Sequence, residues 1–251
     1  MSERDWMALV RAGMPPFWKA MALDAGGSAW ERDGVLASII PAVPSRSVFN
    51  SVFYEDTASL LDSLDDLAAA YDEAGVEAWT VWVPEEDTEA AAGLERAGHL
   101  LDAKPRAMAM ETSELLMPEP DSELVVRERD DMAELARLNE VAYGYPAGDF
   151  SPVAAMELDG LHVHFADLDG ETVGTVAIWD HGTDGILAWV ATLPEARGRG
   201  VSSALTAEAV ARARDRGMET TSLQATKLGY PVYRRVGYRD YGVLQMWERR
   251  K

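Results

Sequence analysis

The stretch that decides the fold is PEARGRGVSSAL, residues 194–205. It follows the apolar run GILAWVAT (185–192), which predicts a strand. Residues 201–216 are rich in Ala and contain neither Gly nor Pro, as expected of a helix, and Gly217 marks the helix end. Apolar residues recur at a spacing of four, at Val201, Leu205, Ala209 and Ala213. The stretch therefore joins a strand to an amphipathic helix through a loop with two glycines.

This loop has the chemistry of an anion-binding site. The first N–H groups of a helix lack partners within the helix, and the helix dipole places partial positive charge there. Gly198 and Gly200 leave these amides open to a ligand, because glycine has no side chain. Charge and further donors come from Arg197, Arg199, Ser202 and Ser203. The loop therefore predicts a site for a phosphate or a pyrophosphate.

Two common phosphate-binding folds do not fit the loop. A P-loop requires a Lys followed by Ser or Thr after the glycines, and none is present. A dinucleotide-binding fold requires an acidic residue at the end of the next strand. Here that strand ends in Gln-Ala-Thr-Lys (224–227), and the strands before the loop form an antiparallel hairpin. We therefore discount both folds.

Charge is distributed unevenly along the chain. The formal net charge is -20, which excludes nucleic acid and anionic membranes as general partners. Residues 191–251 nevertheless carry 12 Lys and Arg against 6 Asp and Glu, and the rest of the chain carries 11 against 37. This asymmetry favours one anionic ligand of modest size at the C-terminal end, although surface arginines could fall there without a ligand.

Several classes of protein and site are excluded by composition. The chain has no Cys, so we expect no disulfide, no thiolate metal site and no Cys nucleophile. His162 and His164 share one face of a predicted strand, but no third ligand is evident, so we read them as ordinary strand residues and expect no metal. The first residues show neither a signal peptide nor a membrane span, and we expect a cytoplasmic protein.

The C-terminal part alternates strands and helices. Residues 162–180 predict a hairpin that turns at Asp169-Gly170, preceded by a strand at 124–126 and a helix that Asp130 or Asp131 caps. After the glycine loop and its helix come a strand (220–226), a short helix (230–236) and a final strand (241–250). Residues 117–123, with two prolines, predict a linker.

The N-terminal half repeats part of this order. Thr57 is the expected cap of a helix that ends before Gly75, followed by a strand (78–83), a helix ending near Gly98 and a strand (107–113). Gly75 and Gly217 are 142 residues apart, and Gly98 and Gly237 are 139 apart. The similar offsets predict a degenerate internal repeat, with coincidence between two common arrangements as the alternative.

Residues 123–251 resemble the GNAT superfamily of acyl-CoA-dependent N-acyltransferases. The family signature, Gln/Arg-x-x-Gly-x-Gly/Ala, is matched by Arg197 to Ser202, with Ser in place of the usual Gly or Ala. The resemblance implies acetyl-CoA as co-substrate and no metal. It also implies that the loop holds the pyrophosphate, and that the backbone of the preceding strand pairs with the pantetheine arm at Val190 and Thr192. The implied loop residues are Arg197, Gly198, Arg199, Gly200, Val201, Ser202 and Ser203.

A second match to the family is Tyr233, four residues before Gly237-Tyr238. In the family, the Tyr at this position protonates the departing thiolate. A phenol with a pKa of about 10 is protonated at neutral pH and can donate to a thiolate of comparable basicity. Taken alone, Tyr233 is better explained as a core residue with a wet hydroxyl. Beside the loop, the resemblance implies a general acid.

The N-terminal half lacks both features. The repeat offsets place Glu55, Ala58 and Leu60 opposite the loop residues, and Leu94 opposite Tyr233. We therefore expect an α/β (α+β) chain of two GNAT-like domains, each a mixed, mostly antiparallel sheet flanked by helices. The expected boundaries are 1–116 for a degenerate domain, 117–123 for the linker and 124–251 for the acetyltransferase domain.

The expected activity is transfer of acetyl from acetyl-CoA to a primary amine, small molecule or peptide, by direct attack in a ternary complex. Tyr143 and Tyr145 are expected at the acceptor site. Candidate bases are Glu140, Asp180, His181 and Asp184, with none preferred. A non-catalytic acyl-CoA-binding or protein-interaction module is the alternative, and a longer acyl or aminoacyl donor and a homodimer stay open.

Overall fold

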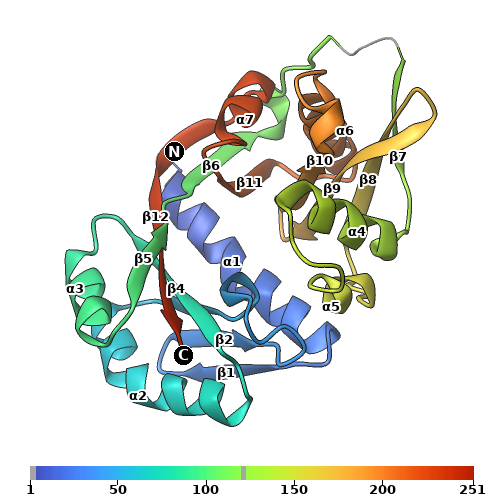
Figure 1. The fold of residues 1–251 in the computed structure, drawn as a ribbon. Helices are drawn as coiled ribbons and strands as arrows, with labels where there is room; N and C mark the ends of the chain where they lie inside the picture. Colours follow the sequence, from blue (N-terminus) through green and yellow to red (C-terminus); the bar gives the residue numbers. More distant parts are fainter. Residues whose placement is uncertain (1–3, 120–122) are drawn as a thin grey trace. The chain divides into compact units, whose positions relative to one another are not determined.

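The computed structural model describes residues 4–119 and 123–251. These residues form two compact units (Figure 1). The C-terminal unit contains Met1–Gly13, as far as it is described, and Ala107–Tyr241, and the N-terminal unit contains Met14–Arg106 and Gly242–Lys251. Residues 120–122 of the expected linker lie outside the described part of the chain, so the boundary at 117–123 stays a prediction.

The C-terminal unit has a sheet in the order β6-β11-β10-β9-β8-β7. The three pairings from β7 to β10 are antiparallel, whereas β10 and β11 are parallel. Its strands are β6 (Arg106–Glu111), β7 (Leu124–Glu128), β8 (Leu161–Leu168), β9 (Glu171–His181), β10 (Asp184–Thr192), β11 (Thr220–Ala225) and the start of β12 (Arg239–Arg250). Its helices are α4 (Met132–Tyr143), α5 (Ser151–Ala154), α6 (Val201–Asp215) and α7 (Tyr230–Val236). The predicted mixed fold with a mostly antiparallel sheet is confirmed.

The N-terminal unit has a sheet in the order β1-β2-β3-β4-β12, and β5 also pairs with β12. Here too one pair, β3 and β4, is parallel. Its strands are β1 (Ser28–Arg32), β2 (Val35–Ile39), β3 (Ser51–Tyr54), β4 (Ala78–Pro84) and β5 (Leu100–Ala103). Its helices are α2 (Thr57–Glu73), α3 (Thr88–Arg96) and the second part of α1 (Trp6–Asp24).

The two units share one order of elements. In each, a strand leads through a helix to a parallel strand and then to a second helix: β3-α2-β4-α3 and β10-α6-β11-α7. Gly75, Gly98, Gly217 and Gly237 follow these four helices, with φ of +72°, +88°, +103° and +117°. Such backbone angles favour glycine and end helices. The order that the sequence predicted is therefore present in both halves of the chain.

The two halves of the sequence exchange their last strands. The last strand of the N-terminal half, β6, lies in the sheet of the C-terminal unit, and the end of the last strand of the C-terminal half, β12, lies in the sheet of the N-terminal unit. β6 follows the N-terminal helices in sequence but lies beside β11 in the C-terminal unit. The end of β12 pairs with β4 in the N-terminal unit, from Leu244 opposite Pro84 to Arg250 opposite Ala78. The sequence predicted both strands but not this exchange, because a strand's own residues do not specify its sheet.

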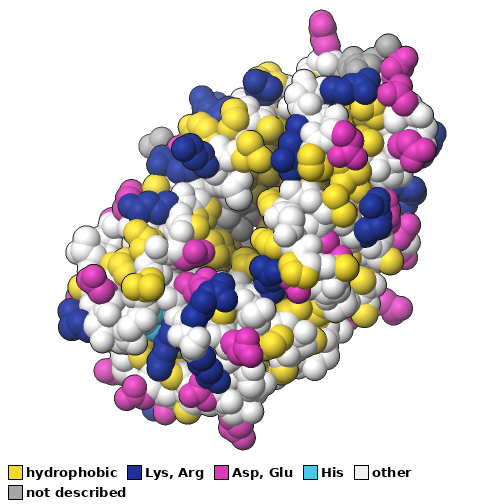
Figure 2. All heavy atoms as spheres, viewed as in Figure 1, with side chains coloured by type: hydrophobic (Ala, Val, Ile, Leu, Met, Phe, Trp, Pro, Cys, Tyr) yellow, Lys and Arg dark blue, Asp and Glu magenta, His cyan; other side chains and the backbone are white. Residues whose placement is uncertain are grey.

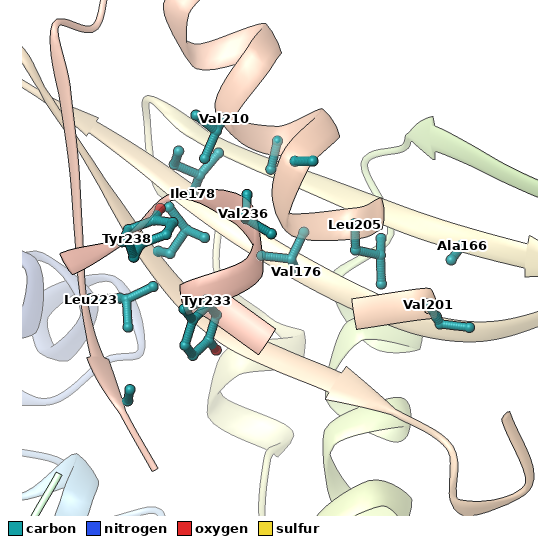
Figure 3. Close-up of a cluster of buried hydrophobic side chains, with 14 of the residues drawn as sticks. Ala166, Val176, Ile178, Val201, Leu205, Val210, Leu223, Tyr233, Val236 and Tyr238 are labelled. Atoms are coloured by element: carbon teal, nitrogen blue, oxygen red, sulfur yellow. The ribbon is translucent and has the colours of Figure 1, made fainter. Parts of the chain in front are cut away.

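The predicted apolar face of α6 packs into the core of the C-terminal unit. Val201, Leu205, Ala209 and Ala213 are all buried. Figure 3 shows Leu205 and Val210 of α6 near the strand residues Val176 and Ile178, with Val236 of α7 among them. Because the start of α6 is fixed by this packing, the glycine loop before it has a defined position.

Three helices differ from the prediction or complete it: two in the residue that caps them, and one because the sequence did not predict it. Asp56, not Thr57, caps α2, and its carboxylate accepts a hydrogen bond from the Ser59 N–H (2.9 Å). Asp131 caps α4 through the Glu134 N–H (3.0 Å). α1 was not predicted, because Pro15 and Pro16 lie inside it and proline opposes a helix interior.

The surface carries both signs of charge. On the face seen in Figure 2, dark-blue Lys and Arg side chains are scattered among magenta Asp and Glu side chains. Of the helices that the structure describes, none has the length and apolar character that a membrane crossing requires.

We predict that Gly217→Ala destabilises the protein by about 1–2 kcal/mol, because an L residue is strained at a φ of +103°. Apart from Gly217 and its two chain neighbours, no described atom lies within 4 Å of the added Cβ, so the effect comes from the backbone. Gly182→Ala, at a φ of +59° in a turn of the same unit, is the control and should cost less. Urea unfolding measures both, and equal stability losses would contradict the prediction.

Candidate active site

A cavity opens where β10 and β11 separate. The two strands pair through Asp184, Gly185 and Ile186, opposite Thr220, Thr221 and Ser222. Beyond these pairs lies a cavity of about 310 Å³. It is lined by Ala142, Tyr143, Leu187, Ala188, Trp189, Val190, Ala191, Thr192, Ala196, Arg197, Gly198, Gly200, Val201, Ser202, Ser203, Leu223, Gln224, Thr226, Leu228, Gly229, Val232, Tyr233 and Arg235. The structure thus brings together the predicted site residues, except Arg199 and Tyr145.

A bulge at Trp189 shapes the β10 wall of the cavity. Between Ala188 and Ala191, β10 has one more residue than the facing segment of β9. Trp189 takes a φ of +51°, which is rare for a bulky L residue and costs on the order of 1–2 kcal/mol. The buried Asn139 on α4 donates to the Trp189 carbonyl (3.3 Å) and to its own helix at Leu135 (2.9 Å). Asn139 therefore ties α4 to the bulge, a role that sequence reasoning missed.

Side chains also hold the backbone carbonyls that follow the bulge. The Tyr143 hydroxyl donates to the Val190 carbonyl (2.8 Å). The Arg197 guanidinium donates to the Thr192 carbonyl (3.3 Å) and to the Ala142 carbonyl (2.6 Å). Val190 and Thr192 therefore line the cavity as expected, but Tyr143 and Arg197 occupy their carbonyls.

The glycine loop supplies one end of the cavity. Gly198 and Gly200 both have a φ of +80°, and Gly200 is the N-cap of α6. Within the described residues, no side chain caps this helix, and no atom lies within 4 Å of a Cβ built on either glycine. The Ser202 hydroxyl bonds the Thr192 hydroxyl (2.7 Å), which fixes the end of β10 to the start of α6. The helix start is therefore open to a ligand on its cavity side.

Arg199 is placed differently from Arg197. It is not among the residues that line the cavity, and its guanidinium lies 3.2 Å from the Asp169 carboxylate and 3.8 Å from the Glu123 carboxylate. All three side chains are exposed, so these ion pairs are weak. The sequence could not show that both arginines of the loop have protein partners.

Tyr233 lies in the cavity wall on α7. Its side chain is 8% exposed, and the ring packs edge-on against Tyr238 with centroids 5.8 Å apart. Figure 3 shows its hydroxyl pointing away from the core side chains Val210 and Val236. Burial raises the pKa of Tyr233 well above its usual value, so the phenol is protonated at neutral pH.

The aromatic residues expected at the acceptor site form a stack. The ring centroids of Tyr143 and Tyr145 are 5.8 Å apart, and those of Tyr145 and Phe150 are also 5.8 Å apart. Tyr143 lines the cavity and is 46% exposed, whereas Tyr145 is one ring removed from it. The stack leaves Tyr143 as the member that can contact a ligand in the cavity.

The four candidate bases have other partners. Glu140 accepts hydrogen bonds from the Gly148 and Phe150 N–H groups (2.8 Å each). Asp180 binds Arg216 with both oxygens, at 2.6 and 2.9 Å. Asp184 is buried and accepts from the Thr220 and Ser222 hydroxyls, and His181 stacks on Trp179. As far as the chain is described, none of the four lines the cavity.

The paired strand histidines lie on β8, away from the cavity. The His162 ring is 2.7 Å from the Glu128 carboxylate, and the fully buried His164 is 3.8 Å from it. Burial lowers the pKa of His164 from 6.5 to about 4. In the described part of the chain, no group of three or more His, Asp or Glu residues is placed to hold a metal ion.

Comparison with known proteins agrees with this fold. Residues 159–240 match the family model of the acetyltransferase (GNAT) domain. A GCN5-related N-acetyltransferase from Kribbella flavida is 18% identical, with a TM-score of 0.70 over 93% of this chain and 94% of that chain. One from Sphaerobacter thermophilus is 19% identical, with a TM-score of 0.66 over 86% and 76%.

A tandem GNAT protein from the clavulanic acid biosynthesis pathway is 11% identical, with a TM-score of 0.60 over 87% of this chain and 81% of that chain. No curated protein matches the chain in sequence. At these identities the structural likeness shows the fold, which is that of the GCN5-related N-acetyltransferases. The segment that matches the family model contains the glycine loop and Tyr233.

We predict that the free energy of unfolding falls as the pH drops from 6.5 towards 4, because unfolded His164 binds a proton that the folded state excludes. Its contribution is full above pH 6.5 and has a slope of up to about 1.4 kcal/mol per pH unit below it. Unfolding measured against pH should give a shallower slope for His164→Gln than for the wild type. The exposed His181→Gln is the control, and a reduced slope there as well would contradict the assignment.

Proposed function

We propose that the C-terminal unit transfers an acetyl group from acetyl-CoA to a primary amine. One observation carries this proposal: a single cavity has the uncapped start of α6 at one end and the Tyr233 hydroxyl in its wall. The fold and the family match of residues 159–240 support the choice of acyl-CoA as the donor.

The donor's pyrophosphate would lie against the glycine loop. The amides of residues 198–203 and the helix dipole attract a diphosphate, and Gly198 and Gly200 let it approach. Arg197 contributes charge at the cavity, and Arg199 contributes charge beside it once its exposed ion pairs yield to the ligand. The pantetheine arm would run along β10 past Thr192 and Val190, which β11 leaves without a strand partner.

The chemical step is a direct transfer in a ternary complex. A neutral amine attacks the thioester carbonyl, the new C–N bond forms and the C–S bond breaks. The attacking nitrogen loses a proton to solvent as the tetrahedral intermediate collapses to the amide. Tyr233 donates its proton to the departing sulfur, and the phenolate then takes a proton back from solvent. The dry wall that keeps the Tyr233 phenol protonated also raises the basicity of the thiolate, since burial disfavours both anions. The acceptor amine would approach past Tyr143 and Tyr145.

The N-terminal unit is proposed as a degenerate GNAT-like half that serves as a scaffold. At the start of α2, the Asp56 carboxylate already occupies the position that an anion would take. Leu60 is fully buried in this helix, and Leu94, the counterpart of Tyr233, is fully buried in α3 and has no proton to give. The unit therefore offers neither of the two features on which the proposed chemistry depends.

Donor binding can be tested with a matched pair of variants at the loop. Asn and Asp both tolerate the φ of +80° at Gly198, and they differ in charge. We predict that Gly198→Asp weakens CoA binding by about tenfold or more relative to Gly198→Asn, because the carboxylate repels the diphosphate. Calorimetry with CoA gives both affinities. Saturable binding with equal affinity for Gly198→Asp and Gly198→Asn would exclude the loop from the donor site.

The role of Tyr233 can be tested by removing its hydroxyl alone. We predict that Tyr233→Phe lowers turnover by about tenfold or more while CoA still binds, because the thiolate would leave unprotonated. The measurement is thiol release from acetyl-CoA over a panel of amines. Unchanged turnover would exclude Tyr233 as the acid. CoA binding without thiol release by the wild type, for every amine, would instead favour a non-catalytic acyl-CoA-binding module.

A further inference from the structure

The free edge of β10 has a defined direction. The Leu193 N–H donates to the Val173 carbonyl of the β9 side (2.8 Å), so Leu193 and Ala191 direct their backbone polar groups towards β9. Because these groups alternate along a strand, Val190 and Thr192 direct theirs to the other edge. Parallel pairing with β11 ends at Ile186, so this edge faces the cavity.

The Val190 and Thr192 carbonyls on this edge accept hydrogen bonds from two side chains, Tyr143 and Arg197, which are held in place to different degrees. Arg197 binds the Thr192 carbonyl and, at 2.6 Å, the Ala142 carbonyl, so it joins two backbone segments. The Tyr143 hydroxyl donates to the Val190 carbonyl, and its side chain is 46% exposed. Tyr143 is also the last residue of α4, followed by Gly144 with a φ of +69°. Tyr143 can therefore leave its carbonyl at lower cost than Arg197.

An open strand edge binds an extended ligand through main-chain hydrogen bonds, and the Val190 carbonyl is an acceptor at the centre of that edge. A donor N–H and the Tyr143 O–H approach this oxygen from the same cavity. The pantetheine arm of CoA is extended and carries amide N–H groups. The nucleotide part of CoA has no amide groups of this kind. The hydroxyl therefore stands where an amide of the arm would bind.

We infer that Tyr143 is a positioning residue of the donor site, whose hydroxyl holds the Val190 carbonyl in the free protein and is displaced by an amide of the donor's arm. This inference rests on the proposed acyl-CoA donor. It assigns Tyr143 to the donor strand, in addition to the approach of the acceptor. When the donor binds, the wild-type protein loses the hydrogen bond between the Tyr143 hydroxyl and the Val190 carbonyl. The Tyr143→Phe variant has no such bond to lose.

The test is calorimetry with two probes, CoA and ADP, on the full-length chain. Tyr143→Phe should bind CoA about three- to tenfold more tightly than the wild type, since a net hydrogen bond of this kind is worth that factor. ADP has a diphosphate and no arm, so its affinity should be the same for both proteins. Tyr241→Phe is the matched control, because Tyr241 does not line the cavity, and its CoA affinity should equal that of the wild type.

The outcomes separate this inference from the proposed function. Equal or weaker CoA binding by Tyr143→Phe, with normal binding by the wild type, would overturn the displacement of Tyr143 and leave the donor assignment intact. A similar gain in ADP affinity would also overturn it, because the effect would not depend on the arm. Absence of CoA binding by the wild type would overturn the donor assignment itself.

Discussion

The separation of β10 from β11 is the constraint on which the site depends. Three residue pairs hold the strands together, and the bulge at Trp189 then adds a residue to β10 and turns its backbone. Two neighbouring strands of a sheet that diverge expose edges that would otherwise bond each other. Here the exposed edge becomes the wall of a cavity, with the start of α6 at its end. The cavity therefore exists because a sheet is left incomplete, and the cost is a strained Trp and several backbone groups that need partners.

Those partners come from side chains outside the sheet. Asn139 bonds the Trp189 carbonyl, Tyr143 bonds the Val190 carbonyl and Arg197 bonds the Thr192 carbonyl. Two of these residues lie on α4, so the helix is held against β10 by polar contacts at the bulge. A carbonyl bonded by a mobile hydroxyl can exchange that partner for a ligand, whereas one bonded by a buried amide keeps its geometry. The edge thus combines a fixed bulge with one replaceable contact.

Local chemistry made part of this predictable. Glycines that end helices, the turn at Asp169-Gly170 and the apolar face of α6 depend on neighbours in sequence, and all lie where they were expected. The cavity also brings together the loop and Tyr233, which are separated in the chain only by α6 and β11. The exchange of β6 and β12 and the partners of Arg199 depend on residues far apart in sequence. No residue pattern within these segments reports such contacts, so they became visible in the structure alone.

The two halves show how little the shared fold decides about function. In both, a strand leads into a helix and then into a parallel strand, so both helices present unpaired amides and a positive dipole at the same point. At α2 the residue before the helix is Asp56, whose carboxylate satisfies the Ser59 amide and supplies the negative charge that the dipole favours. At α6 it is Gly200, which supplies neither. One helix start is thus satisfied within the protein, whereas among the described residues no side chain caps the other. The two helix starts therefore differ in the residue before the helix, while the order of strands and helices around them is the same.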